Sequence, residues 1–380
     1  MRFVLNTRSD TAGAQASIFA LASRLRAAGV EATLGDWDNY DRYDVAIFMG
    51  YDHELEKARA ANPAIRVGLA DPKQSRQEWI DAARVADFLL VSSVEQREAF
   101  LRLNRSSFVL LMFPLVEAAP RAHAERDDVV LAYHGNRAHV EAMAGSVTPA
   151  IEELARRRAV RLVCVTNHER YGLPERGLPD PGLVQLEHVQ FEPGADGAIS
   201  SSLAAAIAAA DIGLVPNLLP VEEHRLALRL TASDNPRLAY EPFDWLVRFK
   251  ASSNPGRLYP FARLGVPVVA DFTPSLAQFV DDGVSGCLVA TAEGWFDALD
   301  RLAASATLRA SLAGALRARL DEAVDRQVPD LLAFLSAPPD RKPFVPAGRP
   351  SAEDDLAALG NFASSARPGL AARIRAKLGG

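Results

Sequence analysis

At 380 residues, of which 49% are hydrophobic, the chain is long enough for two globular domains. Its net charge of −6 provides no basic field, so no nucleic-acid partner is expected. The two cysteines, Cys164 and Cys287, stand in separate apolar runs, which fits neither a disulfide framework nor a zinc site. Since no secretory signal and no apolar run of about 20 residues is visible, we expect a soluble, cytoplasmic protein.

The first part of the chain alternates short apolar runs with helical patterns. The apolar runs predict strands over 2–6, 43–50, 65–70, 86–93 and 107–113. Helical periodicity predicts helices over 12–30, 52–61, 75–85 and 94–103. Continuous apolar strands that alternate with helices are typical of a parallel sheet covered on both faces. Residues 1–118 are therefore predicted to form a Rossmann-like unit.

Residues 119–128 are rich in Pro, Ala and charge, and they are predicted to be a linker. The alternating pattern then restarts, with strands predicted over 129–136, 161–167, 183–191, 211–217, 266–271 and 286–290. Helices are predicted over 148–158, 201–210 and 292–335. Residues 129–336 thus form a second Rossmann-like unit, which predicts an α/β protein with two doubly wound domains facing a cleft. Open α/β sheets bind ligands at the carboxyl ends of their strands, so this cleft is the expected site.

Two segments do not fit the alternating pattern. Residues 218–249 form a long polar insertion in the second unit, and loops of this length are often functional. The Pro-rich, basic tail over 337–380 ends in "GLAARIRAKLGG", which predicts a short amphipathic helix. The tail has two open interpretations: a peripheral contact with the cytoplasmic face of a membrane, or a solvated end of the chain.

The stretch "RFKASSNPGR" (248–257) is the first candidate site. Ser253 and Asn254 are candidate caps for a helix that follows, and Arg248, Lys250 and Arg257 add positive charge around its start. Unpaired N–H groups and cations together suit a phosphate or diphosphate. The alternative is an ordinary capped helix with its cations in solvent.

A second candidate is "YHGNRAH" (133–139), which directly follows the first strand of the second unit. Gly135 would allow the backbone to approach a ligand closely, and Arg137 would point into the same cleft as Lys250. His134 would form hydrogen bonds, since no carboxylate stands at a spacing that favours a metal site.

Two further stretches carry candidate residues. In the first strand-to-helix turn, Asp10, Thr11 and Gly13 can form a tight turn whose amides face the cleft, but the turn lacks the G-x-G-x-x-G pattern of dinucleotide-binding proteins. In the insertion, Glu223 and Asp234 are titratable groups that either face a substrate or belong to a solvated loop.

The chain resembles the GT-B glycosyltransferases, in particular the glycogen-synthase-like retaining group that uses nucleotide-sugar donors. "GVPVVADFTPSLAQFVDDGVSGCLV" (265–289) is the strongest match, and "ADIGLVPN" (210–217) is similar to the strand before the donor site. "AGAQASIFALASRLRAAGVEATL" (12–34) resembles the first helix after the N-terminal glycine loop, and "YHGNR" stands where the group has a Gly-Arg pair.

This resemblance implies a metal-independent enzyme without a cofactor, which transfers a sugar to a glycan or lipid-linked acceptor, in surface polysaccharide or glycoconjugate assembly. The first unit would bind the acceptor and the second the donor. The implied diphosphate ligands are Arg137, Arg248, Lys250, Ser253, Asn254 and Arg257. The other implied donor contacts are Gly135, Asn136, Asn217 and Thr273.

One departure from the group concerns its two glutamates eight positions apart, whose slots here hold Ser252 and Pro260. A second is Ala142, where the group has a lysine. The missing glutamates leave an inverting enzyme and a catalytically silent sugar-nucleotide-binding or scaffolding protein open as alternatives. No catalytic residue is assigned, and the candidates are Asp10, His134, Glu223 and Asp234.

Overall fold

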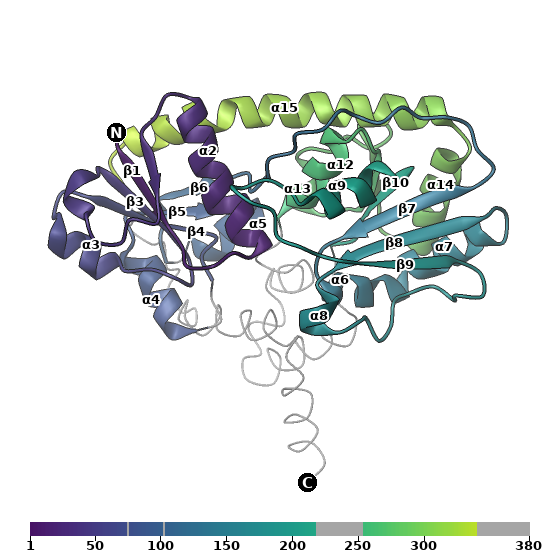
Figure 1. The fold of residues 1–380 in the computed structure, drawn as a ribbon, viewed down its shortest axis with the longest axis horizontal. Coiled ribbons are helices and arrows are strands. Elements are labelled where there is room, and N and C mark those ends of the chain that lie inside the picture. Colours follow the sequence, from purple (N-terminus) through teal and green to yellow (C-terminus); the bar gives the residue numbers. More distant parts are fainter. Residues whose placement is uncertain (74–75, 102, 218–253, 340–380) are drawn as a thin grey trace, which may run out of the picture.

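The computed structural model describes residues 1–73, 76–101, 103–217 and 254–339. These residues form two α/β units, each built on a six-stranded parallel sheet (Figure 1). Two doubly wound domains were expected from the sequence, and the structure confirms them. Of the predicted tail, residues 340–380 lie outside the described ranges, as does the whole of the 218–249 insertion.

The N-terminal sheet has the strand order β2-β1-β3-β4-β5-β6. Its strands are β1 (Phe3–Asn6), β2 (Ala32–Leu34), β3 (Val45–Met49), β4 (Arg66–Ala70), β5 (Phe88–Val91) and β6 (Ser107–Val109). The sequence analysis missed β2, because three residues at a sheet edge leave no readable apolar run. The last predicted strand, over 107–113, pairs only as far as Val109, and Leu110, Met112 and Phe113 are buried beyond the sheet.

The helices of this unit are α1 (Ala12–Ala14), η1 (Gln15–Phe19), α2 (Ala20–Ala27), η2 (Tyr40–Arg42), α3 (Leu55–Ala61), α4 (Gln77–Val85) and α5 (Val94–Phe100). The predicted helix over 12–30 is thus one helix with a π turn at its start. Inserted π turns are frequent at functional sites, and this one lies at the carboxyl edge of the sheet.

The C-terminal sheet has the order β12-β11-β10-β7-β8-β9. Its strands are β7 (Val129–His134), β8 (Val160–Thr166), β9 (Gln185–Gln190), β10 (Ile212–Val215), β11 (Val268–Asp271) and β12 (Cys287–Val289). Every residue of β7, β10 and β11 is buried, as expected for central strands covered on both faces.

The helices of the second unit are α6 (Arg137–Ala142), η3 (Met143–Gly145), α7 (Val147–Ala155), α8 (His168–Tyr171), α9 (Ser201–Ala208), η5 (Pro255–Arg257), α12 (Leu258–Arg263), α13 (Pro274–Ala277), α14 (Ala292–Ala303) and α15 (Ala306–Ser336). None of the helices within the described ranges combines the length and the hydropathy that crossing a bilayer requires.

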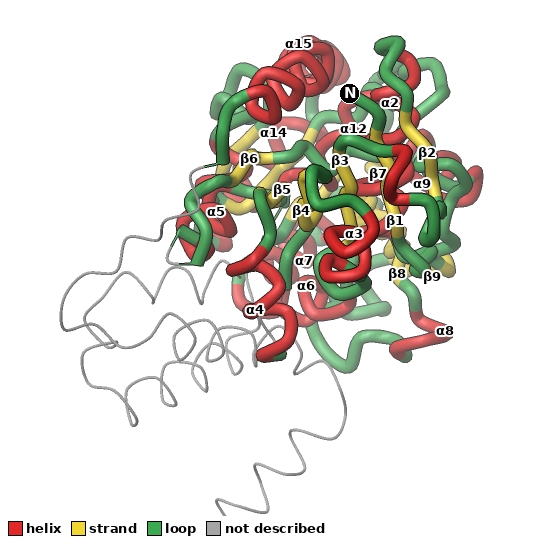
Figure 2. Tube along the Cα trace, turned by 90° about the vertical axis from the view of Figure 1, so that its left-hand side faces the viewer, coloured by secondary structure: helices red, strands yellow, loops and turns green. Residues whose placement is uncertain are grey.

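Helix α15 spans both units. Its first half packs Leu316 and Leu320 into the core of the C-terminal unit. Its second half packs Leu331 and Leu335 against the N-terminal sheet. Figure 1 shows the helix along the upper edge of both sheets, and Figure 2, turned by 90°, again places it at the top of the molecule. The end of the segment 129–336 therefore lies on the N-terminal unit.

The predicted linker runs along the C-terminal unit. The Arg121 backbone N–H donates to Leu264 O at 2.9 Å, and its side chain forms an ion pair with the buried Asp211 at 3.0 Å. Glu125 accepts a hydrogen bond from the backbone N–H of Ala306, at the start of α15. These contacts tie the linker to the second sheet.

A loop before α9 docks the C-terminal unit onto the first helix. The Gly197 N–H donates to Gln15 Oε1 at 2.8 Å, and Gly197 O accepts from the Leu115 N–H at 2.7 Å. Gly197 has a φ of +87°, and a Cβ there would lie 2.4 Å from the backbone nitrogen of Ala20. Only glycine lets the two backbones approach this closely.

We predict that Gly197→Ala destabilises the protein far more than Gly29→Ala. Both glycines have positive φ, but a Cβ at Gly29 would meet nothing within 4 Å. Gly29→Ala should cost about 1 kcal/mol of unfolding free energy, from backbone strain alone. Gly197→Ala should cost about 2 kcal/mol more, because the domains must move apart. Urea unfolding measures both values, and equal losses would contradict this account of the docking.

Candidate functional site

A pocket of about 200 Å³ lies where the two units meet. The N-terminal unit contributes Gly13, from the first strand-to-helix turn, and Asp71, from the end of β4. The C-terminal unit contributes His134 and Gly135, from the end of β7, and Arg257, from the start of the α12 helix. The pocket thus brings together three of the stretches that the sequence analysis singled out, at the expected carboxyl edges.

The first strand-to-helix turn is a capped helix start. Thr11 Oγ1 accepts from the Ala14 N–H at 3.3 Å, as the cap of α1. The same oxygen lies 3.2 Å from Tyr51 Oη. Gly13 is exposed and lines the pocket directly, whereas Asp10 is exposed and lies outside the pocket lining.

Gly135 is required at the end of β7. Its φ is +141°, and a Cβ there would lie 2.9 Å from Tyr133 Oη and 3.1 Å from Arg257 Cδ. The next residue, Asn136, caps α6 by accepting from the Ala138 N–H at 2.9 Å. The glycine thus keeps one wall of the pocket open to a ligand.

His134 is a buried, neutral imidazole in the pocket wall. Its Nε2 lies 3.2 Å from the backbone oxygen of Arg257. Because a carbonyl oxygen can only accept, Nε2 carries the proton and Nδ1 is a hydrogen-bond acceptor. Burial, and secondly the positive charge of Arg257, lower the pKa of His134 to about 4. At neutral pH, this side chain can accept a hydrogen bond from a hydroxyl but carries no positive charge.

Arg257 is the cation of the C-terminal wall. Its Nη1 donates to Pro216 O at 2.5 Å, and its Nη2 donates to Asn217 Oδ1 at 2.6 Å. Burial lowers the pKa of this guanidinium. Asn254 Oδ1 accepts from the Gly256 N–H at 2.9 Å, which confirms the predicted cap.

Buried polar contacts fix the position of Asn217, which holds Arg257. The Asn217 N–H donates to Asp271 Oδ2 at 2.7 Å, and its Nδ2 lies 3.4 Å from Thr273 Oγ1. Asn217 and Thr273, expected as donor contacts, lie behind Arg257 and do not line the pocket.

The first turn of α5 joins the two units beside the pocket. Glu95 is fully buried, and its Oε1 accepts from the Ser275 N–H of the other unit at 3.1 Å. Gln96 is equally buried, and its Nε2 donates to Pro72 O at 2.8 Å and lies 3.4 Å from Asp71 Oδ1. The sequence analysis missed Glu95, Gln96 and Asp71. One local indication in the sequence that these residues lie near the site is that each follows the carboxyl end of a predicted strand.

Arg137 lies beside the pocket, not in its lining. Its Nε donates to Glu141 at 2.6 Å, its Nη1 donates to Tyr171 O at 2.5 Å, and its Nη2 lies 3.3 Å from Glu175. These ion pairs raise the pKa of Arg137, with the hydrogen bond to Glu141 as the main cause. The proposed diphosphate contact of Arg137 would require its release from these partners.

The remaining candidates, Arg248, Lys250, Ser253, Glu223 and Asp234, lie outside the described residues. Over the described ranges, no three His, Cys, Asp or Glu side chains are grouped so that they could hold a metal ion.

We predict that His134 makes the stability of the fold depend on pH. Between pH 6.5 and about 4, an unfolded chain binds a proton at this residue and the folded chain does not. The contribution of His134 to stability is therefore complete above pH 6.5, and it is lost as the pH falls toward 4. The loss should be at most about 3 kcal/mol.

His134→Gln should remove this part of the pH dependence. The measurement is the unfolding free energy of wild type and variant across this pH range. Parallel curves for the two proteins would contradict the prediction.

No protein-family model matches the sequence, and a search of curated proteins finds no match. Among solved structures, the chain is similar to a sucrose-phosphate synthase from Thermosynechococcus elongatus, with a TM-score of 0.50 and 12% identity. The match covers 88% of this chain and 99% of that protein. HepE from Anabaena in complex with UDP gives a TM-score of 0.48 and 11% identity, over 88% of this chain and 100% of that one. TarM gives a TM-score of 0.48 and 11% identity, and the match covers 77% of this chain and 55% of that one.

At this level of identity the likeness concerns the fold. The sucrose-phosphate synthase, at a TM-score of 0.50, shares the two-sheet fold described above. The chain therefore has the GT-B glycosyltransferase fold, as expected from the sequence.

Proposed function

We propose that the protein is a glycosyltransferase, which transfers a sugar from a nucleotide-sugar donor to an acceptor hydroxyl in the cleft. The observation that carries the proposal is the composition of the pocket. A half-buried cation, a capped helix start and two glycines converge there from both units. The fold shared with a sucrose-phosphate synthase supports this reaction class.

In the proposed reaction, the bond between the anomeric carbon and the diphosphate breaks, the acceptor oxygen forms the new bond, and the proton of the acceptor hydroxyl passes to the departing diphosphate. The leaving diphosphate gains negative charge as its bond breaks. Arg257 is positioned to stabilise that charge, and its two hydrogen bonds hold it in place before the reaction. Gly13 and Gly135 let the backbone approach the phosphates from opposite walls. We propose that these groups perform the role without a metal.

The remaining walls would position the sugar and exclude water. His134 Nδ1 can accept a hydrogen bond from a sugar hydroxyl, because the imidazole is neutral. The docking of the two units encloses the reacting groups, which favours transfer to the acceptor over hydrolysis. A cytoplasmic location, membrane contact through the tail, and a role in surface glycan assembly are parts of the same proposal.

A second candidate function is a silent protein that binds the nucleotide-sugar without turnover. It is favoured by Pro260, which occupies one of the expected glutamate slots and lines the pocket, so that no carboxylate is available there. The two functions differ in donor hydrolysis. Slow release of free sugar from a bound donor would identify the enzyme, and binding without release would identify the silent protein.

We predict that Arg257→Gln weakens the binding of a nucleoside diphosphate by about 10- to 100-fold, since a hydrogen bond to a charged group contributes about 1.5–3 kcal/mol. Calorimetric titration with UDP, GDP and ADP measures the effect. Arg257→Lys keeps the charge without the two-pronged contact and should fall between wild type and Arg257→Gln.

Arg301→Gln is the control for this prediction, because Arg301 is exposed on α14, pairs with Asp297 and does not line the pocket. Its affinity should equal that of wild type. Thermal unfolding of each variant separates a binding defect from a folding defect. The absence of nucleotide binding by wild type at millimolar concentration would contradict the proposed function.

A further inference from the structure

Asp71 is a carboxylate that the mechanism above does not use. It lies directly after β4 and lines the pocket with only 6% of its surface exposed. Its φ of +49° is in the left-handed region, which is uncommon for a residue other than glycine. Gly50 makes this turn possible, because a Cβ at Gly50 would lie 2.5 Å from Pro72 Cα. The backbone here turns sharply and places a carboxylate at the pocket.

The carboxylate of Asp71 is held from two sides. Lys73 Nζ lies 2.5 Å from Oδ2, and Gln96 Nε2 lies 3.4 Å from Oδ1. Each carboxylate oxygen can accept more than one hydrogen bond, so both oxygens retain capacity for a ligand. Carboxylate oxygens accept hydrogen bonds, which suits this side chain to binding hydroxyl groups.

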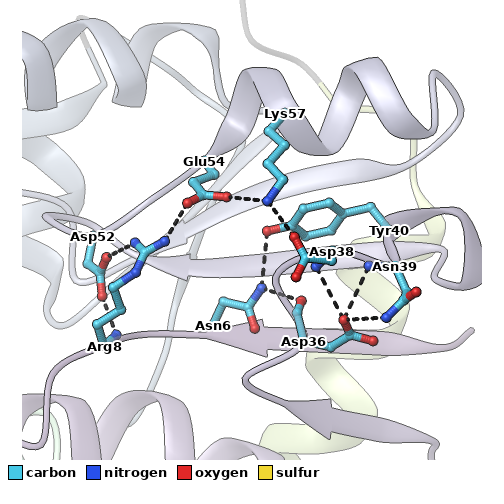
Figure 3. Close-up of polar contacts among 9 residues, drawn as sticks. All are labelled: Asn6, Arg8, Asp36, Asp38, Asn39, Tyr40, Asp52, Glu54 and Lys57. Carbon is cyan, nitrogen blue, oxygen red and sulfur yellow. Dashed lines mark hydrogen bonds and ion pairs between the residues drawn. The ribbon is translucent and has the colours of Figure 1, made fainter.

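The neighbouring loops of the N-terminal unit form an acidic rim, defined here as residues 7–11, 35–39 and 50–57. Figure 3 shows that its cations are already engaged by carboxylates. Arg8 pairs with Asp52 at 2.7 Å and also contacts Glu54, and Lys57 pairs with Asp38 at 2.8 Å.

Among the described residues, the rim presents no unpaired cation, and the N-terminal unit contributes no cation to the pocket lining. Arg8 and Lys57 of the rim, and Lys73 beside Asp71, all lie in ion pairs. A phosphorylated acceptor would have to displace a carboxylate from one of them, and it would meet the negative charge of that carboxylate at close range. An uncharged polyhydroxyl group instead finds an acceptor of hydrogen bonds in Asp71.

We infer that Asp71 is the acceptor-binding residue of the cleft, and that the acceptor group it takes is an uncharged sugar. This inference rests on the proposed function for the role of the sugar as acceptor. Hydroxyl groups of the acceptor donate hydrogen bonds to the Asp71 carboxylate, opposite the wall that carries Arg257. The cation Arg257 would thus bind the negatively charged donor diphosphate, and the anion Asp71 would accept hydrogen bonds from the acceptor hydroxyls.

Saturation-transfer NMR with two probes, methyl α-glucoside and glucose 6-phosphate, tests the inference. Each probe is titrated into the full chain, with and without a nucleoside diphosphate. Wild type should bind the glucoside at least fivefold more tightly than the phosphate. Asp71→Asn keeps the shape but removes the charge, and it should weaken glucoside binding by about tenfold.

Asp81→Asn is the matched control, since it removes the same charge from an exposed position on α4 that contacts Gln77 and Arg84. It should bind both probes as wild type does. Nucleotide affinity should be unchanged in Asp71→Asn, which separates an acceptor defect from misfolding.

Two results would overturn the inference: glucose 6-phosphate binding wild type as tightly as the glucoside does, or glucoside binding that Asp71→Asn leaves intact. Failure of the proposed function gives a different pattern. If the protein binds the glucoside through Asp71 but binds no nucleotide, the inferred sugar site stands and the proposed transferase function is wrong.

Discussion

The pocket exists because two backbones pack directly against each other at Gly197. The loop that contains this glycine meets the first helix without an intervening side chain, and Gln15 accepts its N–H. Residues on both sides of this contact, Ala16 and Ala198, line the pocket. Helix α15 adds a second connection, which runs along the top of both units in Figure 1. The facing carboxyl edges, and with them the pocket, follow from these two contacts.

The first turn of α5 connects the two units beside the pocket. Glu95 receives the N–H of Ser275 from the C-terminal unit, while its neighbour Gln96 holds the segment of Asp71. One oxygen of Glu95 is buried without a hydrogen-bond partner among the described residues, which carries a desolvation cost. A buried carboxylate between two domains is stable only while the domains stay docked, so this contact is sensitive to any movement of one unit against the other.

The site has a polarity that matches the proposed reaction. The C-terminal wall carries Arg257, which is held rigidly by backbone and side-chain acceptors. The N-terminal wall carries Asp71, and the cations around it are already paired. Glu192 of the C-terminal unit also lines the pocket, so carboxylates come from both units. The two contacts proposed for donor and acceptor, Arg257 and Asp71, belong to different units and come together only in the docked molecule.

Much of the fold was predictable from the sequence, because strand runs, helix periodicity and caps are local properties. Asn254 was recognised as a cap from its immediate neighbours, and the structure confirms that role. The close approach of a ligand to Gly135 stays a prediction, although the structure leaves no room for a Cβ there. The contacts of Arg137 could not be predicted from the neighbouring residues in the sequence. Its partner Glu175 is 38 positions away, and no pattern in the sequence indicates that they meet.

What the sequence by itself determined is the two parallel sheets and the edge at which the pocket lies, since the order of strands and helices sets both. Only the tertiary structure decided which charged groups face the pocket. Asp71 lines the pocket because the backbone there makes a left-handed turn, and Gly50, at the end of another strand, leaves room for that turn. Arg257 became a fixed cation through Asn217, 40 positions earlier. Such contacts depend on how distant segments pack, which local periodicity does not encode.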